Sequence, residues 1–174
     1  MMRSKKEQQE IKKRARYYAK NLSNFRNVCK DTNNAIITQS RWEYNCMGYA
    51  IGTYEWETLD HFTWTPIDHD TGELDMDYMC DVLWDCVDEI LEHFPKMRLI
   101  RSPRELQSNE HAVAFRLSET DFHWARLGSD GVWTHKPGHS TIRTMSEYEF
   151  CGNWCADLRS DPYISDTIFF AVAA

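Results

Sequence analysis

The hydrophobic period of the chain changes once, at Pro95, and this change constrains the fold more than any other feature. Between residues 75 and 94 apolar side chains recur at helical spacing, opposite a stripe of acidic side chains, which predicts an amphipathic helix. Proline cannot continue such a helix. Beyond it, apolar and polar residues alternate with period two, which indicates β-strands. The predicted strands are 97–100, 111–117, 121–127, 132–136, 141–144 and 167–173.

Helices followed by an antiparallel sheet indicate an α+β fold. A chain of 174 residues is long enough for one domain with a full hydrophobic core. We therefore expect a single domain over residues 31–174, with its helices packed on the sheet. A further helix is predicted at 5–22 and a short strand at 35–40. In the central helix, the acidic stripe is expected to be solvated, and Cys80 and Cys86 to lie in the core or at its boundary.

The first thirty residues form a basic arm. Residues 1–30 contain ten Lys and Arg against two Glu, a charge of +8, whereas the whole chain carries −7. Such an arm can bind nucleic acid or an acidic partner, or it can pack on its own acidic domain. We favour packing and solvated charge, because no recognised nucleic-acid motif accompanies the arm. The sequence carries no indication of the oligomeric state.

The cellular location is predicted from the length of the apolar runs and from the composition of the N-terminus. No run approaches the roughly 20 apolar residues that span a bilayer, and the first ten residues lack the apolar stretch of a secretory signal. We expect a cytoplasmic protein with no membrane contact, whose six cysteines are free thiols. Cys151 and Cys155 resemble half of a zinc site, but no second pair matches their spacing, so no metal is predicted.

Cys46 is the candidate nucleophile. Asn45 is a favourable N-cap residue, so Cys46 would lie in the first turn of a helix, where free backbone N–H groups and the helix dipole favour a thiolate. The same N–H groups could stabilise an oxyanion. The alternative is a buried core thiol, which is how most free cysteines behave.

His123 and His135 are the candidate partners of that thiol. Both lie on a predicted hairpin, and their relation depends on its loop. A two-residue loop would turn His135 away from His123. A three-residue loop at 129–131, with Gly131 left-handed, would pair Ala125 with His135 and bring both imidazoles to one face. We favour the latter, with His123 as base and His135 as the group that orients it. His139 is an alternative orienting residue, and core histidines without chemistry are the alternative to both.

Four segments together resemble a group of bacterial and phage proteins: NCMGYAIG at 45–52, DFHWAR at 121–126, DGVWTHKPG at 130–138 and DTIFFAV at 166–172. Their order is similar to that of papain-like cysteine hydrolases, and especially NlpC-type cell-wall peptidases. The resemblance implies a papain-like α+β fold in which a cysteine on a helix meets a histidine and a third polar residue on strands. It implies these roles: Cys46 as nucleophile, His123 as base, His135 as orienting residue, and Asn45, Arg126, Trp133 and Lys136 at the cleft or shaping the hairpin.

We therefore expect a cysteine hydrolase that cleaves an amide, isopeptide or related acyl bond of a peptide or other amide-containing substrate through a thioester. Such chemistry needs no metal or organic cofactor. Hydrolysis and acyl transfer both remain open. One alternative is a non-catalytic binding or inhibitor protein that contacts a host partner through its basic arm. Another is a peptidoglycan amidopeptidase.

Overall fold

The computed structural model describes residues 6, 9, 44–138, 142–152, 154 and 162–174. The predicted helix at 5–22, the predicted strand at 35–40 and the proposed boundary at residue 30 lie largely or wholly outside these residues. The helices and strands in these residues are α4 (Cys46–Ile51), α5 (Met76–His93), β1 (Met97–Ile100), η1 (Pro103–Glu105), β2 (Glu110–Leu117), β3 (Phe122–Leu127), β4 (Trp133–His135), β5 (Arg143–Met145), α6 (Glu147–Cys151) and β6 (Ile168–Ala173).

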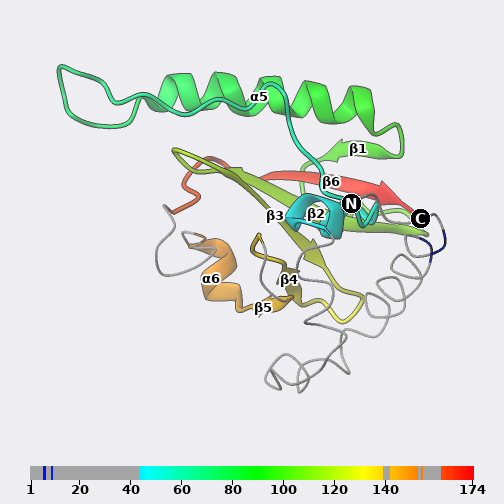
Figure 1. The fold of residues 1–174 in the computed structure, drawn as a ribbon. Coiled ribbons are helices and arrows are strands. Elements are labelled where there is room, and N and C mark those ends of the chain that lie inside the picture. Colours follow the sequence, from blue (N-terminus) through cyan, green and yellow to red (C-terminus); the bar gives the residue numbers. More distant parts are fainter. Residues whose placement is uncertain (1–5, 7–8, 10–43, 139–141, 153, 155–161) are drawn as a thin grey trace.

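The described strands form one six-stranded sheet in the order β1-β6-β2-β3-β4-β5, and every neighbouring pair is antiparallel. With its helices, the sheet gives the expected α+β class. The predicted strands are confirmed to within two residues at their ends. Strand β6 lies between β1 and β2, although it comes last along the chain (Figure 1).

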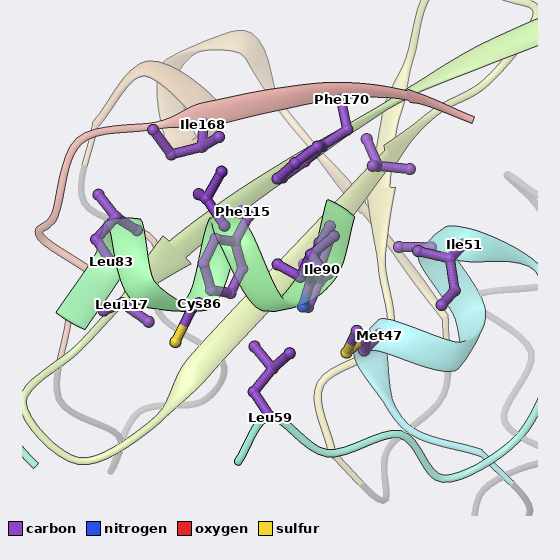
Figure 2. Packing of buried hydrophobic residues seen from close by; sticks show 14 of the residues in the cluster. Met47, Ile51, Leu59, Leu83, Cys86, Ile90, Phe115, Leu117, Ile168 and Phe170 are labelled. Carbon is purple, nitrogen blue, oxygen red and sulfur yellow. The ribbon is translucent and has the colours of Figure 1, made fainter. Parts of the chain in front are cut away.

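The first face of the sheet, called here the α4/α5 face, carries the main core. Strand residues alternate between faces, so Val113, Phe115, Trp124 and Phe170 all point to this side. Helices α4 and α5 cover them, and the buried side chains form one continuous cluster (Figure 2). Burial of this apolar surface is the main term that stabilises the arrangement.

The opposite face, called here the α6 face, carries a second cluster around Ala114, Ala125 and Trp154. Arg116 lies beneath α6, where it donates hydrogen bonds to the carbonyl oxygens of Phe150 and Gly152. Its guanidinium group also stacks over the Trp154 ring, 4.5 Å from the centroid. Arg116 therefore supplies partners for carbonyls that the end of α6 leaves unpaired.

Helix α6 was not predicted from the sequence. Its N-terminus is a capping box: the Ser146 hydroxyl accepts a hydrogen bond from the Glu149 N–H, and the Glu149 carboxylate accepts one from the Ser146 N–H. The signal Ser-x-x-Glu is visible at 146–149, but the helix that it begins has only five residues.

Helix α5 follows the predicted pattern with one exception. Asp75 caps its N-terminus, and the helix ends at His93, two residues before Pro95. Cys86 is fully buried, as expected, whereas Cys80 is exposed, so the prediction of a core or boundary role for Cys80 is wrong. Cys80 lies one turn from Met76 and Trp84, which are also exposed, and this side of the helix does not face the sheet.

Glu89 joins α5 to the connection that precedes it. Its carboxylate is 6% exposed and accepts hydrogen bonds from the backbone N–H groups of Asp60 and His61, at 2.7 and 2.9 Å, and contacts the His61 ring at 3.0 Å. Burial alone would raise the pKa of this carboxyl group, but these donors outweigh it and leave the pKa below its ordinary value. None of the helices in the described part of the chain is both long and apolar enough to span a bilayer.

We predict that Glu89→Gln lowers the free energy of unfolding by about 1–3 kcal/mol, because an amide offers one acceptor oxygen where the carboxylate offers two. Urea denaturation monitored by circular dichroism measures the change. Glu92→Gln, an exposed position on the same helix, is the matched control and should change stability by less than about 0.5 kcal/mol. Equal effects of the two substitutions would contradict the anchoring role of Glu89.

Candidate active site

The β3–β4 hairpin has the register that the three-residue loop predicts. Ala125 pairs with His135, and Leu127 pairs with Trp133. The Gly131 N–H donates to the Gly128 carbonyl and the Gly128 N–H to the Val132 carbonyl, while Gly131 has φ +76°. A glycine adopts this left-handed conformation without steric cost. The predicted register is therefore confirmed.

This register brings the two histidines together on the α6 face. The Nε2 of His123 lies 2.8 Å from the Nδ1 of His135, and the ring planes are inclined at 78°. Because the two nitrogens share one hydrogen bond, one of them is protonated and donates, and the other accepts. The Nδ1 of His123 makes no hydrogen bond with any residue that the structure describes.

Both imidazoles are enclosed. His123 is 1% exposed and His135 is 6% exposed, and the rings of Tyr163 and Trp154 pack against His123 with centroids at 5.1 and 6.2 Å. Burial lowers the pKa of His123 well below its ordinary value, and the neighbouring His135 lowers it further. Burial, followed by the Arg143 charge, lowers the pKa of His135 to about 4. The pair is therefore neutral at neutral pH.

Cys46 is the first residue of α4, and Asn45 is its N-cap as predicted. The Asn45 side chain accepts a hydrogen bond from the Gly48 N–H and donates one to the Glu57 carbonyl. Gly48 is required here, because a side chain at this position would clash with the Glu55 carbonyl. The helix that carries the thiol is thus fixed at both the cap and its first turn.

The thiol is nevertheless held in its neutral form. Cys46 is 5% exposed, and burial, followed by the Asp121 charge, raises its pKa to about 12. The N–H groups of Trp124 and Met47 and the Lys136 charge oppose this rise. The N-terminus of α4 therefore acts in the predicted direction, but loss of hydration outweighs it.

The thiol and the histidine pair approach strand β3 from different sides. Helix α4 packs on the α4/α5 face, whereas the side chains of His123 and His135 point to the α6 face. No hydrogen bond joins the Cys46 sulfur to His123. The sulfur is close to the Trp124 N–H, however, and Trp124 directly follows His123. The two groups therefore flank the same point of β3, where β4 ends.

The other predicted site residues are not gathered into one cleft. Trp133 stacks on Phe150 of α6 with ring centroids 4.2 Å apart. Lys136 is fully buried, with its Nζ over the Tyr44 ring and donating to the Gly138 carbonyl. Arg126 contacts the C-terminal end of α4. His139, the alternative orienting residue, lies outside the described residues.

Sequence reasoning missed Asp121, Trp154 and Tyr163 as parts of this site. The Tyr163 hydroxyl donates a hydrogen bond to the Asp121 carboxylate at 3.1 Å, and the Tyr163 and His123 ring centroids are 5.1 Å apart. The Asp121 charge also helps to raise the pKa of Cys46. Only Asp121 lies within a recognised motif, and no spacing links the other two to it. Within the part of the chain that the structure describes, no cluster of three or more His, Cys, Asp or Glu could hold a metal ion, and Cys155 is not among these residues.

Comparison with family models, with curated proteins and with solved structures finds no match to this chain. Its function must therefore be argued from the site itself.

We predict that the protein loses stability as the pH falls from about 6.5 to 4. His111 and His135 have folded-state pKa values near 4, below the unfolded value of 6.5, so the unfolded chain binds more protons in this range. At pH 5 each residue should cost about 2 kcal/mol relative to pH 7. Thermal or urea unfolding across the range measures the slope, and His135→Gln should reduce it.

His69→Gln is the control for that slope, since His69 is exposed. It should leave the pH dependence of stability unchanged. A slope that is the same in the wild type and in the His135→Gln and His111→Gln variants would show that these imidazoles are not buried in the neutral form.

Proposed function

We propose that the protein is a cysteine hydrolase with a papain-like α+β domain, acting on an amide, isopeptide or related acyl bond. The observation that carries the proposal is the buried hydrogen bond of 2.8 Å between His123 and His135, on the other side of β3 from a cysteine at the start of a capped helix. A nucleophile, a base and a group that orients the base are the minimal set for covalent acyl transfer. The resemblance to NlpC-type peptidases supports the same roles.

The tautomers of the histidine pair define the path of the proton. The Nε2 of His123 is hydrogen-bonded to His135, so the Nδ1 of His123 is the nitrogen that exchanges a proton with the thiol. As the sulfur attacks the substrate carbonyl carbon, its proton passes to this Nδ1, and this transfer requires the two groups, which lie on different sides of β3, to come within hydrogen-bonding reach. Collapse of the intermediate breaks the C–N bond, and the leaving amine takes the proton from His123. The product of this step is a thioester.

Water completes the cycle. His123 removes a proton from the attacking water, the C–S bond breaks, and the released sulfur recovers the proton as a thiol. Because burial keeps both the thiol and the imidazoles neutral, the mechanism starts from a neutral pair and transfers the proton during attack. An amine in place of water would give acyl transfer.

We predict that p-nitrophenyl acetate, an activated acyl donor, forms an acetyl thioester on Cys46 that hydroxylamine removes. Cys46→Ala should abolish this adduct. His123→Asn should slow its formation by about a hundredfold or more, the usual contribution of a general base, and His135→Gln should slow it less. Intact-mass spectrometry with peptide mapping measures both the site and the rate.

Exposed thiols require a control in this experiment. Cys80 and Cys151 are exposed, so the assay uses a Cys80→Ser, Cys151→Ser background, which should keep the rate at Cys46. Acylation that is insensitive to Cys46→Ala and His123→Asn would refute the proposed chemistry. Turbidity loss of purified cell walls tests peptidoglycan as the substrate.

A non-catalytic binding protein is the second candidate, and the low exposure and raised pKa of the Cys46 thiol favour it. In that case Cys46→Ala and His123→Ala would preserve the effect of the protein on a bacterial host, whereas removal of residues 1–22 would abolish it. Growth of a host that expresses each variant distinguishes the two candidates.

A further inference from the structure

A cavity of about 700 Å³ lies at the C-terminal end of α4. Its wall is formed by the residues that follow α4, the turn between α5 and β1, and parts of β2, β3 and β6. Cys46, His123 and His135 are not among its lining residues. Since α4 rises about 1.5 Å per residue, the cavity is about 8 Å along the helix from the thiol. Its volume falls within the range of small-molecule sites.

Arg126 presents unused hydrogen-bond donors at this cavity. Its guanidinium group is half-buried and lies against Gly52, the C-cap of α4. Its one hydrogen bond runs from Nη1 to the Tyr49 carbonyl and is long, at 3.4 Å. A guanidinium group has five N–H donors. The remaining donors make no hydrogen bond with any residue that the structure describes.

Thr53 supplies a second polar group without a partner. Its Oγ1 is buried and makes no hydrogen bond, although Thr53 lines the same cavity. A buried hydroxyl without a partner costs free energy, and such groups are few in folded proteins. A Cβ at the preceding residue, Gly52, would lie 3.8 Å from the Arg126 Nη1, so the backbone next to Thr53 passes beside the guanidinium group.

The charged side chains of the wall are cationic and favour an anion, although Ala174, the last residue of the sequence, also lines the cavity. Arg126 and Lys96 line the cavity, and no Asp or Glu side chain does so among the described residues, although the whole chain carries −7. His111 also lines it, and its Nε2–H donates a hydrogen bond to the Ala50 carbonyl, so Nε2 is the protonated nitrogen. Tyr54 and His93 also line the cavity, and much of the remaining wall is apolar, including Ile51, Phe94, Met97 and Val172.

We propose that this cavity binds a small organic carboxylate with an apolar tail. The carboxylate pairs with the Arg126 fork, and the tail packs on the apolar wall. The Thr53 hydroxyl, which is buried in this structure, donates to the carboxylate after its side chain changes rotamer. A planar carboxylate matches the geometry of a guanidinium fork, and the apolar wall suits a hydrocarbon tail better than a larger polar headgroup. This site is separate from the proposed thiol chemistry and does not depend on it.

Hexanoate and its neutral analogue hexanamide test the proposal in a protein-detected NMR titration of the full chain. Wild-type protein should bind hexanoate at millimolar concentration or below, and hexanamide about tenfold more weakly. Arg126→Gln should weaken hexanoate by about tenfold or more while leaving hexanamide unchanged. Thr53→Val should also weaken hexanoate without lowering the melting temperature, because it removes an unpaired hydroxyl.

Arg104→Gln, at an exposed arginine, is the matched control and should keep wild-type affinity. Cys46→Ala should also keep it, which separates this site from the hydrolase proposal. Equal binding of the acid and the amide, binding that Arg126→Gln and Thr53→Val leave unchanged, or no binding of either compound would overturn the assignment. If Arg126→Gln fails to fold, Thr53→Val and Lys96→Gln replace it in the binding experiment.

Discussion

The pairing of Ala125 with His135 is the constraint on which both faces of the sheet depend. Because side chains alternate along a strand, a slip of one residue would exchange the contents of the two faces. In the observed register Trp133 and His135 point toward α6, and Thr134 points toward α4, where its hydroxyl lies 2.7 Å from that of Tyr49. The short loop ending at Gly131 thus sets the packing of α4 and α6 at the same time.

Burial decides the charge state of the candidate site. The thiol lies at a helix N-terminus and near a lysine, both of which favour the thiolate, yet its pKa is raised to about 12. The histidine pair is kept neutral by the same loss of hydration. A site built in this way holds no preformed ion pair, so its charges must develop during the reaction. This distinguishes it from cysteine sites in which the thiolate exists at rest.

Local signals predicted most of the described fold. The change of period at Pro95, the N-cap at Asn45 and the glycine at 131 each act over a few residues, so sequence alone was sufficient for α5, α4 and the hairpin register. Helix α6 was missed because its capping box precedes only one short turn.

The partners of the site could not be predicted in the same way. Tyr163 and Trp154 pair with each other in an isolated bridge between α6 and β6, and both pack against His123; no pattern in the sequence encodes that contact. The sheet face on which α4 packs could not be predicted either, because it depends on tertiary burial rather than on residue spacing.

The position of β6 has a consequence for how the chain is assembled. Strands β2 to β5 pair with neighbours in sequence, but β1 joins the sheet only through β6, which is synthesised after them. Until residues 168–173 leave the ribosome, one edge of β2 has no strand beside it and α5 cannot close over a finished core. Completion of the fold therefore waits for contacts between distant parts of the chain, which slows folding and leaves an unpaired edge open to association in the nascent protein.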